Sequence, residues 1–328
     1  MDNKAKIANA LVATQLAMIG AVCAQDRPGG YPTKPIRIVS SVQPGAGGDT
    51  MARIVAQIIA DKWGTNVVVD NRAGAGGTIA SELVARAAPD GYTLYSQGDS
   101  LLIQGATKRV PFDVLKAFEP VTPTSQQPYI LITQINFPVK SIKELAAYSQ
   151  NNRVTYSGSS GIGSMPHIGM ERFAKLSGAK FTFVAYKGSG PGIIAVIGGE
   201  IHMVAASSIG ASMALRTGKV RALANLGPKR IPSMPDLPTV AEQGFPGFKV
   251  TNRYGLQSPA GTPKEIVLAL NRVVGEGMYD AKLKARLAAD GSEPADRMTP
   301  GEYKAAQAKE YVEIEQQVKQ MDLGTILK

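Results

Sequence analysis

A strand, a loop built almost entirely of small residues and an amphipathic helix follow one another near the N-terminus. Residues 36–42 are rich in β-branched side chains, and residues 43–50 read Gln-Pro-Gly-Ala-Gly-Gly-Asp-Thr. The next residues place apolar side chains on one helix face. These side chains are Met51, Ile54, Val55, Ile58 and Ile59. A sparse loop before a helix exposes backbone amides that bind anions, so this segment predicts an α/β unit that carries an anion site.

The alternation of strand, small-residue turn and helix continues along the chain. Strand candidates at 67–69 and 92–95 flank a second glycine-rich turn at 71–77 and a helix at 79–88. Further strand candidates are residues 153–156, 181–186, 201–205 and 220–226. Strands that alternate with helices form parallel sheets covered by helices. The sequence therefore predicts two α/β units, each with a mostly parallel sheet.

A second loop of small polar residues, 157–164, precedes a helix that starts near His167. If this loop faces the first one, two helix starts clamp a carboxylate between them. His167 either donates to the bound anion or braces the loop, and bracing is the favoured role. Asp49 and Asp99 are likewise either ligand contacts or helix caps, with capping favoured for Asp49.

Capping boxes of the form Ser/Thr-x-x-Glu mark three helix starts. They pair Ser141 with Glu144, Thr262 with Glu265, and Thr299 with Glu302. Proline follows the hydroxyl residue in the last two, at the helix position where a missing N–H costs nothing. These signals predict C-terminal helices over residues 263–289 and 300–321. A proline-rich connection nearby contains a predicted short helix at 239–243.

The first 24 residues have the form of a secretory signal peptide. Two lysines precede an apolar stretch over residues 7–21, and small residues precede a cleavage point after Ala24. A membrane anchor is less expected because the apolar run is short. Cys23 is the one cysteine of the chain, so cleavage leaves neither a disulfide nor a thiol. We expect export to the periplasm of a Gram-negative bacterium.

The formal net charge of +10 favours anionic ligands. Nucleic-acid binding needs clustered basic residues with aromatic platforms, whereas aromatic residues make up 6% of this chain and its basic pairs are isolated. Neither glycine-rich loop matches the dinucleotide motif or the phosphate loop. The sequence therefore predicts no nucleic-acid partner and no cofactor.

Catalytic chemistry has one weak candidate, the segment 206–210, which resembles a nucleophile elbow with alanine in place of the first glycine. A periplasmic serine hydrolase that uses Ser207 or Ser208 is therefore an alternative. Both histidines precede these serines, opposite to the α/β-hydrolase order, although other triad orders stay open. His167 and Glu171 share a helix face without a third metal ligand. We expect neither an enzyme nor a metal site.

Seven short segments, together with the signal, resemble the Bug family of TctC-like receptors, the solute-binding proteins of tripartite tricarboxylate transporters. The resemblance covers essentially the whole mature chain, in order. The segments are residues 44–49, 71–77, 88–94, 186–191, 218–224, 237–242 and 259–263.

The resemblance implies a type II periplasmic binding protein that has two α/β domains, with two crossover strands as the hinge. The implied first domain comprises residues 31–128 plus 250–328, and the second comprises residues 129–249. Such a receptor closes on a small carboxylate and delivers it to the large and small membrane subunits of its transporter. A ligand sensor that signals to a sensor kinase ectodomain is the open alternative.

The resemblance also implies that loops 43–50 and 157–164 hold a carboxylate through amides, hydroxyls and waters. Many relatives have an acidic residue where this chain has 206–208, so a counter-charge for an amino-acid ligand is missing. Arg253 replaces an aromatic residue and either pairs with a second carboxylate or is solvated. We expect a dicarboxylate, aliphatic or aromatic. The predicted ligand-binding residues are Gln43, Gly45, Gly47, Gly48, Asp49, Thr50, Ser96, Gln97, Ser157, Ser160, Gly161, Ser164, His167, Ser207, Ser208 and Arg253.

Overall fold

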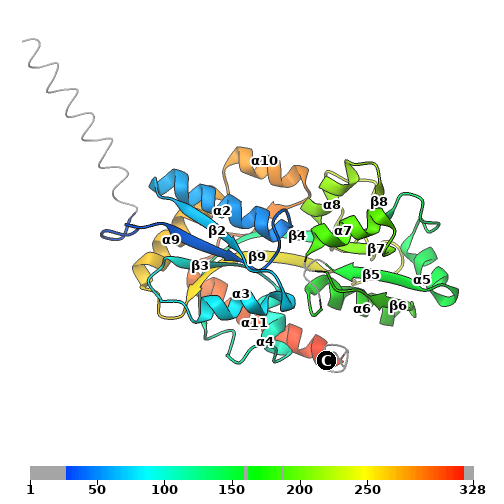
Figure 1. Ribbon diagram of the computed structural model, residues 1–328, viewed down its shortest axis with the longest axis horizontal. Coiled ribbons are helices and arrows are strands. Elements are labelled where there is room, and N and C mark those ends of the chain that lie inside the picture. Colours follow the sequence, from blue (N-terminus) through cyan, green and yellow to red (C-terminus); the bar gives the residue numbers. More distant parts are fainter. Residues whose placement is uncertain (1–26, 159–161, 187, 321–328) are drawn as a thin grey trace, which may run out of the picture.

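The computed structural model describes residues 27–158, 162–186 and 188–320, so the predicted signal segment lies outside it. Figure 1 shows an elongated molecule in which two α/β bodies lie end to end, with the strands β4 and β9 between them. Within these described ranges, no helix has the length and apolar character needed to cross a membrane.

A single ten-stranded sheet runs through the described residues, and the long strand β4 (Phe118–Gln134) takes part in both of its halves. We call these halves part A and part B. Part A contains β2 (Val67–Asn71), β1 (Ile36–Ser40), β3 (Thr93–Gly98), β9 (Thr251–Pro259), β10 (Glu293–Pro294) and the first half of β4. Part B contains the second half of β4, β8 (Val220–Asn225), β7 (Met203–Ser207), β5 (Val154–Gly158) and β6 (Phe181–Phe183).

The α/β fold class is confirmed, and the outer strands of each part are parallel as predicted. β1 pairs in parallel with β2 and β3, and β5 with β6 and β7. The two long strands, β4 and β9, instead pair antiparallel with each other and with β3, β7 and β8. β4 changes partners between Pro128, which pairs with Thr251, and Tyr129, which pairs with Ser207. The domain boundaries at 128/129 and 249/250 stay a prediction.

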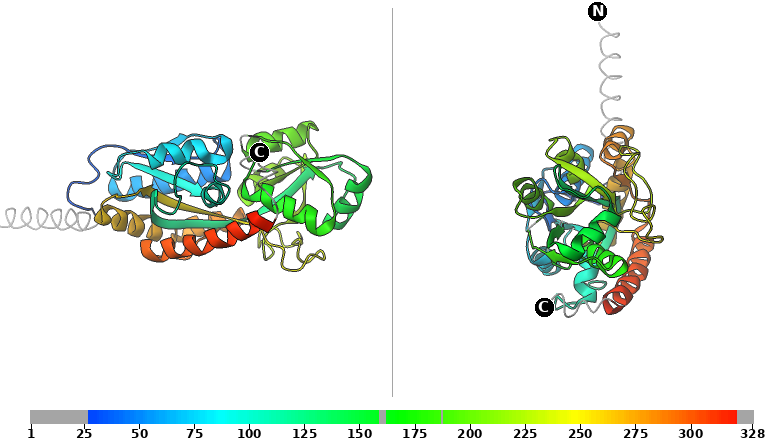
Figure 2. Two further views of the ribbon diagram at one scale, coloured as in Figure 1. Left: turned by 90° about the horizontal axis from the view of Figure 1, so that it is seen from below. Right: turned by 90° about the vertical axis from the view of Figure 1, so that its right-hand side faces the viewer.

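Helices cover both faces of the two parts. Part A carries α2 (Gly47–Trp63), the 3-10 turn η1 (Ala75–Gly77), α3 (Thr78–Ala85), α4 (Ser100–Ala106), α9 (Lys264–Gly277), α10 (Ala281–Ala289) and α11 (Pro300–Gln320). Part B carries α5 (Ile142–Asn151), α6 (Met165–Ser177), α7 (Ser189–Gly198) and α8 (Ser208–Leu215). Figure 2 shows α11 running along part A as far as the junction with part B. There, Ile314 of α11 packs in one cluster with Ile168 of α6.

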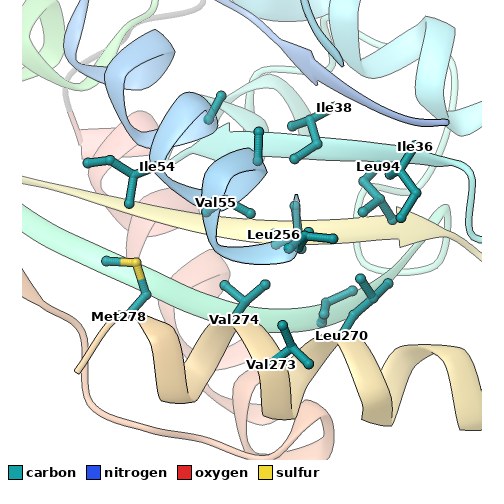
Figure 3. Packing of buried hydrophobic residues seen from close by; sticks show 14 of the residues in the cluster. Ile36, Ile38, Ile54, Val55, Leu94, Leu256, Leu270, Val273, Val274 and Met278 are labelled. Carbon is teal, nitrogen blue, oxygen red and sulfur yellow. The ribbon is translucent and has the colours of Figure 1, made fainter. Parts of the chain in front are cut away.

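The main core of part A lies between the sheet and the helices α2 and α9 (Figure 3). Leu256 of β9 packs in it with Val55 of α2 and Val274 of α9, and all three are at most 1% exposed. The predicted apolar face of the first helix is confirmed, since its residues belong to this core. Tyr95 and Phe118 lie in a separate cluster on the side of α3, α4 and α11. The core therefore fixes α2 rigidly over the end of β1.

Several local predictions need correction. The hydroxyl of Thr262 donates to the Pro259 carbonyl instead of capping α9, and Pro263 takes the N-cap position. The predicted helix over 263–289 is two helices, because Asp280 caps a new start at α10 with a bond from the Leu283 amide. The predicted short helix at 239–243 is a series of hydrogen-bonded turns.

The other two capping residues act as predicted. The Glu144 amide donates to the Ser141 hydroxyl, and the Glu302 amide donates to the Thr299 hydroxyl. The Glu302 carboxylate returns to the Thr299 amide as predicted, whereas the Glu144 carboxylate accepts the Lys140 backbone amide instead of the Ser141 amide, so the predicted return bond at Ser141 is wrong.

Candidate anion site at the junction of the two sheet parts

The first candidate loop connects β1 to α2 and ends earlier than its sequence suggests. α2 begins at Gly47, and its N-cap is Ala46, which offers no side-chain cap. The prediction of Asp49 as the N-cap is therefore wrong, because the small residues before it already adopt helical geometry. The first amides of a helix have no intrahelical partner. The start of α2 thus presents uncapped N–H groups, together with the positive end of a helix of 17 residues.

Asp49 lies in the first turn of α2 and organises the loop around it. Its carboxylate accepts bonds from the Gly45 amide at 2.9 Å, from Arg53 Nε at 3.0 Å and from Asn71 Nδ2 at 2.9 Å. Burial raises the pKa of Asp49, but the hydrogen bonds from Arg53, Gly45 and Asn71 outweigh it and hold the pKa below its ordinary value. Direct contact between Asp49 and a ligand stays a prediction.

Two further residues of this loop hold its shape. The Gln43 carbonyl accepts the Ala46 amide at 3.2 Å, and the Thr50 hydroxyl donates to the Ala46 carbonyl at 3.3 Å. Gly48 packs closely on Tyr254 of β9, since a methyl carbon at position 48 would lie 3.2 Å from the Tyr254 ring. Tyr254 therefore forms the floor beneath the start of α2.

Gly47 brings the start of α2 against part B. A methyl carbon at position 47 would lie 2.6 Å from the Ser207 Oγ and 3.3 Å from the Gln127 Nε2. Ser207 is the N-cap of α8, and its Oγ accepts the Gly210 amide at 3.4 Å. Because an added side chain would collide there, glycine permits the N-termini of α2 and α8 to meet.

Gln127 of β4 lies at this meeting point and is 1% exposed. Its Oε1 accepts the Ser208 hydroxyl at 3.1 Å, whereas its Nε2 has no hydrogen-bond partner among the described residues. Buried donors are nearly always paired, so an orphan donor beside two helix starts indicates a place for an acceptor atom. The sequence does not single out Gln127, because residues 124–126 directly before it are polar as well.

The second candidate loop shows a similar arrangement. Ser164 is the N-cap of α6 without a side-chain cap bond, and its buried Oγ has no partner within the described part of the chain. Ser157 is fully buried at the end of β5, where its hydroxyl donates to the Gly158 carbonyl. The predicted residues Ser160 and Gly161 lie outside the described residues. A second uncapped helix start therefore belongs to part B.

His167 lies in the first turn of α6 and is 1% exposed. Its Nδ1 accepts the Gly163 amide at 3.0 Å, and its ring packs on Phe183 with 4.0 Å between centroids. Burial and then the positive charge of Arg109 lower the pKa of His167 to about 4. A neutral His167 therefore braces the loop, and direct contact with a ligand stays a prediction.

The remaining candidates lie on and beside β3. Ser96 is 4% exposed, and Gln97 donates through Nε2 to the Tyr303 hydroxyl of α11 at 3.2 Å. Arg253 of β9 pairs with Glu310 of α11 at 2.5 Å. A ligand carboxylate at Arg253 would have to compete with Glu310. The predicted ligand contacts of these residues stay predictions.

Asp99 occupies the N-cap position of α4, but its side chain makes no cap bond. Its Oδ2 accepts the Arg253 amide at 3.1 Å. Burial and then the negative charge of Glu310 raise the pKa of Asp99 well above its ordinary value, although Arg253 opposes them. Asp99 is therefore a poor carrier of negative charge beside the junction.

The raised pKa of Asp99 predicts how the stability depends on pH. Between the unfolded and the folded pKa the folded state binds more protons, so this carboxyl lowers the free energy of unfolding as the pH rises. Asn at position 99 keeps the acceptor for the Arg253 amide without a charge. We expect Asp99→Asn to stabilise the protein at pH 8, and the gain to shrink towards pH 4. Urea unfolding of the wild type and the variant between pH 4 and pH 8 measures the difference in their free energies of unfolding. A difference that does not change with pH would contradict the raised pKa of Asp99.

A cavity of about 1170 Å³ lies between α2, α9 and α10, and Gly45, Asp49 and Thr50 of the first candidate loop are among its lining residues. Its lining carries charges of both signs, so an anion gains little net attraction there. The charged lining residues are Asp49, Arg53, Asp61, Lys62, Glu276, Asp280 and Arg286. The junction, where the uncapped start of α2 lies beside the unpaired Gln127 Nε2, is therefore the better candidate for an anion site.

The sequence is similar to proteins of a known family. Residues 51–319 match the tripartite tricarboxylate transporter family receptor. Protein BugT of Bordetella pertussis is 33% identical over 269 residues, which are 80% of this chain and 82% of BugT. These relatives are receptors and not enzymes, so the prediction of no enzyme is confirmed and the hydrolase alternative at Ser207 or Ser208 is not supported.

Solved structures show the same fold. The periplasmic binding protein BugD is 30% identical with a TM-score of 0.83, and the match covers 89% of this chain and 99% of BugD. MatC from Rhodopseudomonas palustris, solved with malate, is 30% identical with a TM-score of 0.82 over 88% of this chain and 100% of MatC. Another R. palustris protein, solved with adipate, is 30% identical with a TM-score of 0.84 over 89% of this chain and 98% of its own.

Proposed function

The chain belongs to the tripartite tricarboxylate transporter receptor family, and we propose that it captures a small dicarboxylate between the starts of α2, α8 and α6. It is a periplasmic solute-binding receptor of the Bug and TctC type, as the sequence predicts. The malate and adipate bound to its structural neighbours both carry two carboxylates, which supports this ligand class. The proposal includes aromatic as well as aliphatic dicarboxylates.

The observation on which the proposal rests is that the uncapped start of α2 lies beside a buried donor without a partner, Gln127 Nε2, while the start of α6 in part B has the same two features. α2 and α6 both begin without a side-chain cap, and Gln127 Nε2 and Ser164 Oγ are buried and unpaired. Each helix start stabilises an anion by about 0.3–1 kcal/mol, and more where water is excluded. A carboxylate placed there receives hydrogen bonds from amides and side chains without a dedicated cation.

Hinge closure provides the mechanism of capture in this proposal. β4 and β9 connect the two parts, and we place the hinge where β4 changes partners between Pro128 and Tyr129. Opening would separate Gly47 from Ser207 and admit the ligand. A dicarboxylate that contacts both part A and part B binds the closed conformation better than the open one. Binding therefore shifts the population of receptor molecules towards the closed conformation.

Calorimetric titration against malate, adipate, phthalate and the matching monocarboxylates tests the ligand class. We expect the protein to bind one molecule of its preferred dicarboxylate. The affinity should be at least roughly tenfold higher than for the matching monocarboxylate, because a second carboxylate adds charge-assisted bonds. Small-angle scattering should show compaction on binding. Equal affinity for the two classes would contradict the proposal.

Delivery to the large and small membrane subunits of a transporter is the second step that we propose. Deletion of the receptor gene should abolish uptake of the dicarboxylate that titration identifies. Unchanged uptake together with a lost transcriptional response would instead favour the sensor alternative.

A further inference from the structure

The second glycine-rich turn, at residues 74–77, is a place where part A touches part B. Arg109, which follows α4, donates through Nη1 to the Ile162 carbonyl at 2.6 Å and through Nη2 to the Ala75 carbonyl at 3.2 Å. Ile162 belongs to the loop between β5 and α6, whereas Ala75 belongs to the turn in part A. A single guanidinium therefore bridges the two loops.

The backbone on the part A side of this bridge adopts an unusual conformation at two residues. Lys108 has a φ of 54° and Ala75 has a φ of 49°, and they are the non-glycine residues with positive φ among those described. L-residues seldom adopt this region, and local strain of this kind is concentrated at functional sites. Lys108 turns the chain so that the Arg109 amide donates to the Gln104 carbonyl at 2.9 Å. Both strained residues thus lie next to the same contact.

Buried contacts also hold the turn from beneath. Gln104 is 1% exposed, donates through Nε2 to the Gly76 carbonyl at 3.0 Å, and accepts the Ser81 hydroxyl at 2.7 Å. A methyl carbon at position 76 would lie 2.8 Å from both the Ile162 carbonyl oxygen and the Arg109 Nη1. The turn is therefore rigid, and glycine at 76 permits the two loops to approach.

The charge of Arg109 is not neutralised by an ion pair with any carboxylate of the described residues. Its field reaches the start of α6, where it contributes to the lowered pKa of His167. A carboxylate near that helix start would be attracted by the same charge. Arg109 thus combines a mechanical bridge with an uncompensated positive charge.

We propose that Arg109 is a positioning residue that latches the closed conformation by joining the turn at 74–77 in part A to Ile162 in part B. The inference rests on the proposed function, because a latch has a role only in a receptor that opens. The bond to the Ile162 carbonyl exists when the two parts lie together and is lost when they separate, whereas the bond to the Ala75 carbonyl stays within part A and orients the guanidinium. The latch therefore favours closure and slows the release of the ligand.

Distances between two spin labels test the latch without any ligand. Labels are placed on Val68→Cys in part A and Leu176→Cys in part B, which are 49% and 56% exposed. The background is Cys23→Ser, which removes the one native cysteine. Distances are measured without ligand and with saturating malate or adipate. We expect Arg109→Ala and Gly76→Ala to move population from the short to the long distance.

The matched control is Arg86→Ala, an exposed arginine of part A that pairs with Glu82 and lies outside the bridge. It should leave the distances unchanged. Arg109→Lys keeps the positive charge but loses the planar guanidinium that reaches two carbonyls. This variant should bind the dicarboxylate at the wild-type association rate but release it faster than the wild type does. For Arg109→Ala, stopped-flow release of the bound dicarboxylate should be roughly tenfold faster, in line with the loss of the one charge-assisted bond that joins the two parts.

Distance distributions of Arg109→Ala that match the wild type under every condition would overturn the latch. Thermal unfolding of each variant separates this result from misfolding. A failure of the dicarboxylate proposal appears differently, as an absence of binding in the titration, while the distances without ligand still report on the latch.

Discussion

Gly47→Ala is expected to weaken dicarboxylate binding roughly tenfold to a hundredfold while the protein stays folded. The added methyl carbon would lie 2.6 Å from the Ser207 Oγ and 3.2 Å from the Ser207 Cβ, so α2 and α8 cannot begin as close together as they do now. Overpacking of this kind costs about 1–3 kcal/mol. The cost falls on the closed conformation, because opening separates position 47 from Ser207.

Calorimetry and thermal unfolding measure the two effects of Gly47→Ala separately. Gly301→Ala is the matched control, since it also adds a methyl group in the first turn of a helix but meets nothing within 4 Å. A double variant with Ser207→Ala removes the nearer colliding atom and should recover part of the lost affinity, which a double-mutant cycle quantifies. Wild-type affinity in Gly47→Ala would contradict the proposed closed site.

Gln127→Glu is expected to reduce dicarboxylate binding by up to about a thousandfold. The change replaces the unpaired Nε2 donor by a carboxylate oxygen of the same shape. Two like charges about 4 Å apart repel by roughly 4 kcal/mol at the effective dielectric constant typical near a protein surface. The Ser208 hydroxyl keeps its acceptor at Oε1, so the packing around β4 is preserved.

Two further variants separate the effect of the added charge from the effect of losing the donor. Gln127→Met removes the donor without adding a charge and should cost roughly tenfold. Gln316→Glu, on an exposed position of α11, changes the net charge equally and should have no effect. Binding to Gln127→Glu at the wild-type level would show that no ligand carboxylate lies beside this residue.

Much of the fold follows from local pattern. The spacing of apolar residues predicts the face of α2 that packs in the core, and small residues mark each turn from strand to helix. The antiparallel course of β4 and β9 has no local signal, because pairing between distant strands depends on the whole chain. The division of the C-terminal helices at Asp280 was missed because its capping role competes with an otherwise continuous helical pattern.

The candidate site is only partly readable from the sequence. The two loops are recognisable because small residues before a helix have a direct physical meaning. Gln127 and Arg109 carry no such signal, since each acts through neighbours far away in the chain: Gln127 through Ser208, and Arg109 through Ile162. The partner of Arg253, Glu310, lies 57 residues away, so no local pattern could predict that ion pair.

A crystal structure with the dicarboxylate that binds most tightly in the titration series would locate both carboxylates of the ligand. We expect one carboxylate between α2 and α8, within hydrogen-bond distance of the amides at the start of α2 and of Gln127 Nε2. A ligand held in the cavity between α2 and α10, or a carboxylate that touches neither Gln127 nor the start of α2, would contradict it.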